Sequence, residues 1–366
     1  MKMPLQASRG FGLIELMVAM TISLVLVAAT LTLYLDMSRN NNELAKTNMQ
    51  MESGRLAIAL LRDDLIHAGF WDGFIPMFDD MTAKVEPTDY PDEIPSPCVA
   101  FSGWDAAGIT NRIGLPVDLY TDVPSDCSAV LPDKVEDSDV LVVRHVQTCA
   151  AGDAGCEAEV SGKLYWQTSG CEGESAYLLA TSGLTLNKRD CVTPAPLRKF
   201  VNNIYYIRDY AVTPGDGIPT LMLSTLDLSA GSVTQLAASP MIEGVEAMRF
   251  EFAVDALSDS GEAIAPTAAV LWANDKNRTS PRNRGDGAPD ATCTSSTPCA
   301  LDDLANTVAV KVHLLVRSLE PTQGYNSTKT YSLAGETFGP YSDAFQRHVY
   351  STTVRLINVS GRRETP

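Results

Sequence analysis

Hydrophobic positions are unevenly distributed along the chain, and the longest apolar run lies close to the N-terminus. The run FGLIELMVAMTISLVLVAATLTLYL extends from Phe11 to Leu35 and contains one charged residue, Glu15. A helix of this length spans about 37 Å, enough to cross a bilayer core of roughly 30 Å. The ten residues before it include Lys2 and Arg9 and no acidic residue. This positive flank predicts a cytoplasmic N-terminus and places everything after Leu35 outside.

Two ordinary kinds of N-terminal segment explain this pattern only in part. A secretory signal peptide has an apolar region of about 7–15 residues before a small-residue cleavage site, whereas here Ala28-Ala29 lies inside a longer run. A plain single-pass anchor has the right length but gives no reason for Glu15, because a carboxylate inside a bilayer is costly unless it has a partner. Glu15 is therefore a candidate functional residue. The alternative is that its side chain extends to the lipid headgroups.

The helical pattern continues past the apolar run, with no proline as far as residue 68. Gly54 is the one helix breaker after Gly12, and Gly69 predicts the end of the helix. The spacing predicts an amphipathic helix over 36–68, whose apolar stripe packs on a sheet or, as the alternative, on a partner helix. The apolar residues of the stripe are Met37, Leu44, Met51, Ile58 and Leu65, with Leu61 and Ala68 beside them.

Beyond residue 69 the pattern changes to short alternating stretches. Residues 71–135 are rich in Pro, Asp and Gly and predict a long, loop-rich segment. Alternation at Met248, Phe250, Phe252 and Val254 is typical of strands in half-buried antiparallel sheets. Strands are predicted at 139–146, 163–167, 176–180, 200–210, 220–223, 246–254, 307–317 and 350–358.

The region 273–298 is polar and turn-rich and predicts an exposed loop. It contains the tripeptide Arg284-Gly285-Asp286, which is expected to be a chance occurrence rather than an integrin-binding motif. The acidic pairs Asp79-Asp80 and Asp302-Asp303 are expected to be solvated or to lie at helix N-termini.

All eight cysteines follow the apolar run, and none belongs to a CxxC or zinc-knuckle pattern. An even number of cysteines in an exported region predicts disulfides made in an oxidising compartment. Loop closure favours pairing between neighbours, although some thiols could remain free. The favoured pairs are Cys149–Cys156 and Cys293–Cys299, followed by Cys98–Cys127 and Cys171–Cys191.

The composition and the motifs argue against nucleic-acid binding and against catalysis. The chain has 28 Lys and Arg against 45 Asp and Glu, a net charge of −17 that repels phosphates. The four histidines are scattered, and no HExxH, GxSxG, Walker A, GxGxxG or EF-hand pattern occurs. We therefore expect no enzyme activity, no cofactor, no metal site and no nucleic-acid partner.

The stretch Gly10-Phe11-Gly12-Leu13-Ile14-Glu15 resembles the class III signal of type IV prepilins and type II secretion pseudopilins. The resemblance implies that a membrane prepilin peptidase cuts after Gly10 and N-methylates Phe11. It also implies that Glu15 meets the N-terminal amine of a neighbouring subunit and so fixes the stagger between helices. Major pilins commonly have a helix-bending proline in the membrane half, where this chain has Thr32.

Within the prepilin class, several blocks look like PilW-type minor pilins, which are similar in turn to the J-type minor pseudopilin of type II secretion. These blocks are GRLAIALLRDDLIHAGFW (54–71), IYYIRD (204–209), MIEGVEAMRFEF (241–252) and VAVKVHLLVRS (308–318). The resemblance implies an α+β fold in which the long N-terminal helix packs on an antiparallel, pilin-like head with disulfide-stapled loops. The expected parts are a cleaved leader (1–10), a membrane and filament-core half-helix (11–35), an amphipathic half-helix (36–68) and a periplasmic or extracellular head (69–366).

The resemblance implies a low-copy subunit that primes filament growth and forms part of the tip. The implied partners are other minor pilins, the major pilin, the prepilin peptidase, a tip adhesin and inner-membrane lipid. After assembly the subunit would lie in the pilus at the cell surface. Two alternatives stay open: a minor pseudopilin of type II secretion, and a membrane-tethered adhesin or binding domain that never joins a filament.

Overall fold

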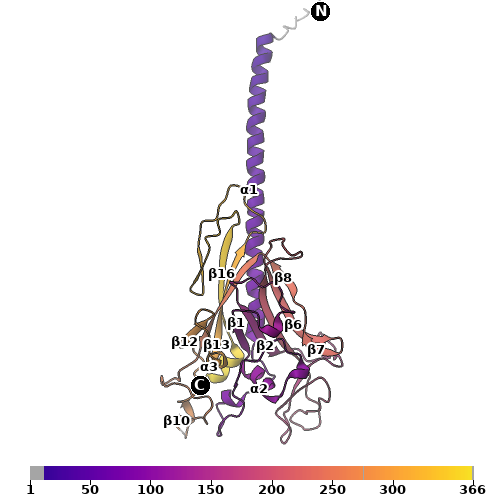
Figure 1. The fold of residues 1–366 in the computed structure, drawn as a ribbon, viewed down its shortest axis with the longest axis vertical. Helices are drawn as coiled ribbons and strands as arrows, with labels where there is room; N and C mark the ends of the chain where they lie inside the picture. Colours follow the sequence, from indigo (N-terminus) through magenta and orange to yellow (C-terminus); the bar gives the residue numbers. More distant parts are fainter. Residues whose placement is uncertain (1–11, 275, 365–366) are drawn as a thin grey trace, which may run out of the picture. The chain divides into compact units, whose positions relative to one another are not determined.

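A computed structural model describes residues 12–274 and 276–364 of the chain (Figure 1). The chain divides into two compact units, with the boundary between Met49 and Gln50. One helix, α1 (Leu13–His67), crosses this boundary without a break over 55 residues. Gly69 follows with a φ of +74°, a left-handed conformation that suits glycine and ends the helix.

The head in the second unit contains two larger antiparallel sheets. In the eight-stranded sheet the order is β1-β2-β5-β3-β4, and β6 pairs with β5 as well as with β7 and β8. Its strands are β1 (Val117–Tyr120), β2 (Val140–Val146), β3 (Tyr165–Thr168), β4 (Tyr177–Ala180), β5 (Arg198–Arg208), β6 (Thr220–Ser229), β7 (Ser232–Gln235) and β8 (Ser239–Glu243). The four-stranded sheet has the order β12-β9-β13-β16. Its strands are β9 (Val245–Val254), β12 (Ala291–Thr294), β13 (Thr307–Arg317) and β16 (Arg347–Arg355).

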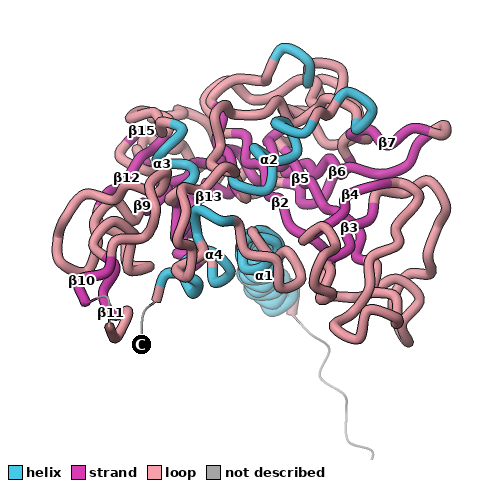
Figure 2. Tube along the Cα trace, turned by 90° about the horizontal axis from the view of Figure 1, so that it is seen from below, coloured by secondary structure: helices cyan, strands magenta, loops and turns pink. Residues whose placement is uncertain are grey.

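Short elements lie in the connections. Two small hairpins are formed by β10 (Trp272–Asn274) with β11 (Thr279–Pro281) and by β14 (Tyr331–Leu333) with β15 (Glu336–Phe338). The short helices are α2 (Ala106–Gly114), α3 (Leu301–Ala305), α4 (Ile357–Arg363) and the 3₁₀ turns η1 (Met77–Asp79), η2 (Phe101–Gly103) and η3 (Ser125–Cys127). Seen along the molecule, α4 lies beside the C-terminal end of α1 (Figure 2).

The main core forms where the C-terminal part of α1 meets both large sheets. Ala57, Leu61 and Leu65 of α1 are fully buried against residues of the two sheets. From β9 and β13 the alternating apolar residues face this core, as the sequence predicts: Met248, Phe250, Phe252, Val254, Val310, Val312, Leu314 and Val316. The α+β class, with a long N-terminal helix and antiparallel sheets, is confirmed.

The face that α1 presents to the core differs in part from the predicted stripe. Leu65, Leu61 and Ala68 are buried, but Met51 is 39% exposed, and Met37 and Leu44 are more exposed still. The buried positions before Leu61 are Gln50, Gly54 and Ala57. Small residues allow the backbones to approach closely, and this contact decides which face of the helix is covered.

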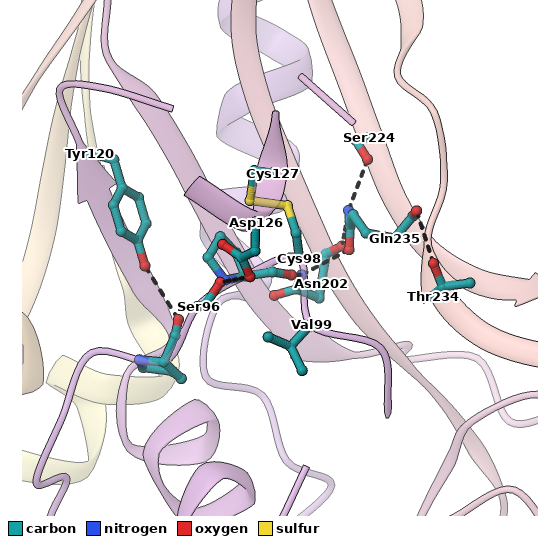
Figure 3. Close-up of a disulfide and its surroundings, with 12 residues drawn as sticks. Ser96, Cys98, Val99, Tyr120, Asp126, Cys127, Asn202, Ser224, Thr234 and Gln235 are labelled. Atoms are coloured by element: carbon teal, nitrogen blue, oxygen red, sulfur yellow. Dashed lines mark hydrogen bonds between the residues drawn. A yellow bond between two sulfur atoms is a disulfide. The ribbon is translucent and has the colours of Figure 1, made fainter. Parts of the chain in front are cut away.

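The segment 71–135 was expected to be mainly loop, yet it contains α2, β1 and three 3₁₀ turns. A polar network holds it on the outer face of the eight-stranded sheet. Arg144 pairs with Asp118 at 2.6 Å, and both side chains are fully buried. Asn202 accepts from Arg144 Nε at 2.9 Å and donates to Pro97 O and to Gln235. Figure 3 shows Asn202 and Gln235 beside the Cys98–Cys127 disulfide.

Two other predictions require correction. The region 273–298 is not a single exposed loop, because residues 283–285 are buried in its middle. Arg284 is 3% exposed and donates to the carbonyl oxygens of Ala265 and Ala268, so the tripeptide is not presented for binding. The predicted strand 350–358 ends early, because α4 begins at Ile357.

The predicted disulfides are present. The eight cysteines form four bonds, each between two cysteines that are consecutive in the order of cysteines along the chain. The bonds are Cys98–Cys127, Cys149–Cys156, Cys171–Cys191 and Cys293–Cys299. The first closes the longest loop, with a sequence separation of 29, and Cys127 is fully buried. This bond fastens the 71–135 segment to itself above the buried network (Figure 3).

Removal of the Cys98–Cys127 bond is expected to cost more stability than removal of Cys149–Cys156. In the chain-entropy account, closing a loop of about 30 residues contributes about 3.5 kcal/mol and one of about 8 residues about 2.5 kcal/mol. The Cys98→Ala/Cys127→Ala variant also leaves a buried cavity. Urea unfolding of the detergent-solubilised full-length variants measures the difference. Equal losses for the two pairs would contradict this ranking.

Candidate assembly site

The predicted processing residues, Gly10 and Phe11, lie outside the described residues. The first described turns of α1 come directly after them. Side chains in this part of the helix are exposed, for example Leu13 at 78% and Ile14 at 74%. Among the described residues, α1 is the one helix long and apolar enough to cross a membrane.

The serine and threonine hydroxyls in the apolar part of α1 bond to backbone carbonyls of the helix itself. Thr21 donates to Val18 O at 2.9 Å, and Ser23 donates to Ala19 O at 2.7 Å. Thr30 and Thr32 make the same kind of bond further along. These side chains therefore need no outside partner when the helix leaves water.

Glu15 is different, because one of its oxygens has no partner within the helix. Its Oε2 accepts from the backbone N–H of Gly12 at 2.9 Å, a bond typical of an acidic residue in a first helical turn. No hydrogen bond or ion pair reaches Oε1 from the described residues. The bond to Gly12 fixes the position of the carboxylate, and no cation among residues 12–274 and 276–364 pairs with it.

At the head end of α1, glycine allows an aromatic ring to lie directly on the helix backbone. A Cβ atom on Gly54 would lie 2.4 Å from Cε2 of Tyr350 in β16, so no other residue fits without displacing the ring. The side-chain amide of Gln50 donates to Val316 O at 2.6 Å. Burial raises the pKa of Tyr350, so the phenol stays neutral in this contact.

One turn from the end of α1, a buried carboxylate joins the helix to the eight-stranded sheet. Asp64 accepts from His145 Nε2 in β2 at 2.8 Å and from Asn203 Nδ2 in β5 at 2.9 Å. Burial first, and then the Asp64 carboxylate, raises the pKa of Tyr205 well above its usual value of 10. The helix is thus held in this position by polar contacts as well as by apolar packing.

The C-terminal end of α1 is capped by a residue from the far end of the chain. Asn358 Nδ2 lies 3.1 Å from Ile66 O and 3.3 Å from both His67 O and Ala68 O. His67 O also accepts from the Phe70 N–H at 2.9 Å. Donors at a helix end satisfy the carbonyls that no N–H of the helix reaches. Near this end the rings of His67 and His145 come within 5.7 Å, although the two residues are far apart in sequence.

Sequence reasoning found Glu15, treated Gly54 only as a helix breaker, and predicted none of the contacts of Asp64, Tyr350 or Asn358. A signal for Asp64 was present, since it is an acidic residue at a helical position between the core residues Leu61 and Leu65. Of the acidic pairs, Asp302 and Asp303 lie in the first turn of α3 as expected. Asp79 is not solvated: it is 3% exposed and pairs with Arg362 and Arg363 of α4.

Two family models match the chain, one at the start of the N-terminal helix and the other in the head. The family model described as "Prokaryotic N-terminal methylation motif" matches residues 5–31, and that of "Type IV Pilus-assembly protein W" matches residues 204–358. The chain is a PilW-like type IV prepilin. The match to the second family begins in β5 and ends in α4, and so includes β9, β13 and the cap residue Asn358.

As a PilW-like prepilin, the chain is a membrane-anchored minor pilin of type IV pili, which assembles with other pilins and has a structural role. Among solved structures, a type IV-like pilin from Thermus thermophilus is 13% identical, with a TM-score of 0.27. That match covers 61% of this chain and 80% of the pilin. No protein of curated function matches the chain.

Gly54→Ala is expected to destabilise the PilW-like chain although alanine favours helices. The gain of about 1 kcal/mol in helix propensity is outweighed by displacement of the Tyr350 ring, which costs about 1–3 kcal/mol beyond it. Gly361→Ala in α4 is the matched control, because nothing lies within 4 Å of a Cβ at that position. Urea unfolding of full-length protein in detergent compares the two. A Gly54→Ala variant as stable as Gly361→Ala would show that the contact is loose.

Proposed function

We propose that this minor pilin primes filament growth and lies in a tip complex with other minor pilins. The observation that carries the proposal is Glu15, the one charged side chain between Leu13 and Leu35 of a helix whose apolar side chains are exposed. Such a surface is suited first to lipid and then to other apolar helices. The carboxylate supplies the polar contact that decides how those helices align.

In this proposal the prepilin peptidase removes residues 1–10 and N-methylates Phe11. Cleavage creates an amine next to the apolar segment, four residues from Glu15 and thus about 6 Å along the helix. An unpaired carboxylate in an apolar environment is strongly unfavourable, whereas pairing with an amine offsets much of the desolvation cost. The Glu15 carboxylate of one subunit then meets the Phe11 amine of a neighbour, and the pair fixes the axial stagger of the two helices.

The proposed topology places the N-terminus in the cytoplasm and the head in the periplasm before assembly. Residues 11–35 lie in the inner membrane and then in the filament core, 36–68 form the stem, and 69–366 form the head. Four disulfides in the head support this placement, because such bonds persist in oxidising compartments. After assembly the head lies at the cell surface, where a tip adhesin is a further proposed partner.

The proposed role needs no bound metal or cofactor and no catalytic group. Among the described residues, no cluster of three or more His, Cys, Asp or Glu side chains is placed to hold a metal ion. The polar groups that the structure brings together, such as Asp64, His145 and Asn203, bond to one another across the helix and the sheet. They support a structural role for the head.

Glu15→Gln is expected to remove the chain from filaments without unfolding it. Glutamine keeps the size of the side chain and loses the charge that pairs with the amine. We expect the amount of the chain in sheared pili to fall at least about tenfold, as for a lost charge pair of more than 1.4 kcal/mol. Immunoblotting of sheared pili and of membranes measures this ratio.

Asp36→Asn is the matched control, since Asp36 lies on the same helix just past the apolar run and has no ion pair among the described residues. This variant should remain in the filament fraction. Wild-type recovery of Glu15→Gln in pili would exclude Glu15 as the assembly contact.

A further inference from the structure

β16 is the last strand of the four-stranded sheet, and its hydrogen bonds to β13 can be assigned residue by residue. Ser318 N–H donates to Gln346 O at 2.8 Å, and Leu356 N–H donates to Val308 O at 2.8 Å. The two bonds lie in the same register, which continues along β16 without a bulge. In an antiparallel pair, alternate residues bond to the partner strand. The even-numbered residues of β16 therefore bond to β13, and the odd-numbered ones direct N–H and C=O to the other side.

On that other side β16 has no strand beside it. Ser351 and Thr353 are exposed. Within the described part of the chain, the backbone groups of Val349, Ser351 and Thr353 have no hydrogen-bond partner. Together they form an unpaired ladder, which is the usual place for an extended segment to add to a sheet.

This edge differs from the other terminal strands of the two large sheets. Those strands, β1, β4, β7, β8 and β12, have four or five residues each, and β8 also contains Pro240. Short strands and proline are common ways to prevent edge pairing. β16 has nine residues, and its central stretch 349–354 contains no proline, charge or bulge. β16 is therefore a long edge strand whose centre has none of these features that prevent pairing.

The free edge also lies beside the head part of α1. Tyr350 of β16 packs on Gly54, and Asn358 just after β16 contacts Ile66, so strand and helix run in the same direction. On this side Arg55 is exposed, has no ion pair among the described residues, and lies near enough to Tyr350 to influence the pKa of its phenol. A cation of this kind suits a partner segment with a carboxylate.

We infer that the free edge of β16 receives an extended, acidic segment of a different pilin-class subunit, which adds to the sheet as a further strand. The inference rests on the proposed function, because a pilin assembles through α1 and this edge lies next to it. A second copy that pairs edge to edge fits less well, because the stretch 349–354 of its own β16 has no carboxylate to meet Arg55. The added strand would use the N–H and C=O groups of Val349, Ser351 and Thr353.

Ser351→Pro tests the edge without disturbing the bonds to β13. Proline removes an N–H that points away from β13, and its ring occupies the place of the added strand. Ser351→Ala is the matched control, because it removes the hydroxyl and keeps the N–H. Both variants are made in the full-length chain, and their melting temperatures in detergent are compared with that of the wild type.

The chain is expressed with its companion minor pilins and purified by a tag from solubilised membranes. We expect Ser351→Pro to recover at least about tenfold less of the companions, which corresponds to about 1.4 kcal/mol of lost strand pairing. Ser351→Ala should recover them as the wild type does. Wild-type recovery by a folded Ser351→Pro variant would overturn the inference.

A photo-cross-linking residue at Thr353 gives a second measurement that does not depend on proline. A cross-link to another pilin-class subunit, identified by its peptides, is the expected result. A cross-link to a second copy of the chain, or none in assembled pili, would overturn the inference. The single variant Glu15→Gln, made in the same strain background, separates the strand addition from the proposed assembly through Glu15. If Glu15→Gln blocks assembly while Ser351→Pro does not, only the strand addition is wrong.

Discussion

The carboxylate of Glu15 needs a cation once the apolar part of α1 is out of water, and most features of the chain relate to this requirement. Within its own helix, Glu15 receives the N–H of Gly12, which fixes its position but does not neutralise it. The serine and threonine hydroxyls further along this part of the helix donate to backbone carbonyls. In the proposed assembly, the remaining charge gives specificity to a surface that apolar contacts alone would leave free to slide.

The head is attached to the other half of the same helix by contacts of a different kind. Gly54 and Ala57 allow close approach of the sheet, Asp64 bonds to two strands, and Asn358 caps the last turn. These contacts join residues far apart in the sequence, by 81 positions for Asp64 and His145 and by 300 for Gln50 and Tyr350. Such a helix end cannot rotate or slide on the sheet without breaking several of them. These contacts therefore hold the head in a fixed position on the C-terminal part of α1.

Much of the fold could be predicted from the sequence where the pattern is long and regular. The helix and the strands β9 and β13 follow from uninterrupted apolar periodicity, and the disulfides from the number and location of the cysteines. The contact face of α1 could not be predicted as well, because Gln50, Gly54 and Ala57 have little hydrophobicity and are covered only through tertiary packing. Arg284 shows the same limit: it lies in a polar stretch yet is buried by its bonds to carbonyl oxygens. The short strand β1 contains Asp118, and periodicity does not show its fully buried pair with Arg144.

The account requires that the amine opposite Glu15 exists, and it exists only if the chain is cut after Gly10. Mass spectrometry of the N-terminal peptide of the chain, recovered from purified pili, tests this most directly. The account predicts that the peptide begins with N-methylated Phe11. A chain that remains in pili with its first ten residues attached would contradict it, because Glu15 would then have no terminal amine to meet.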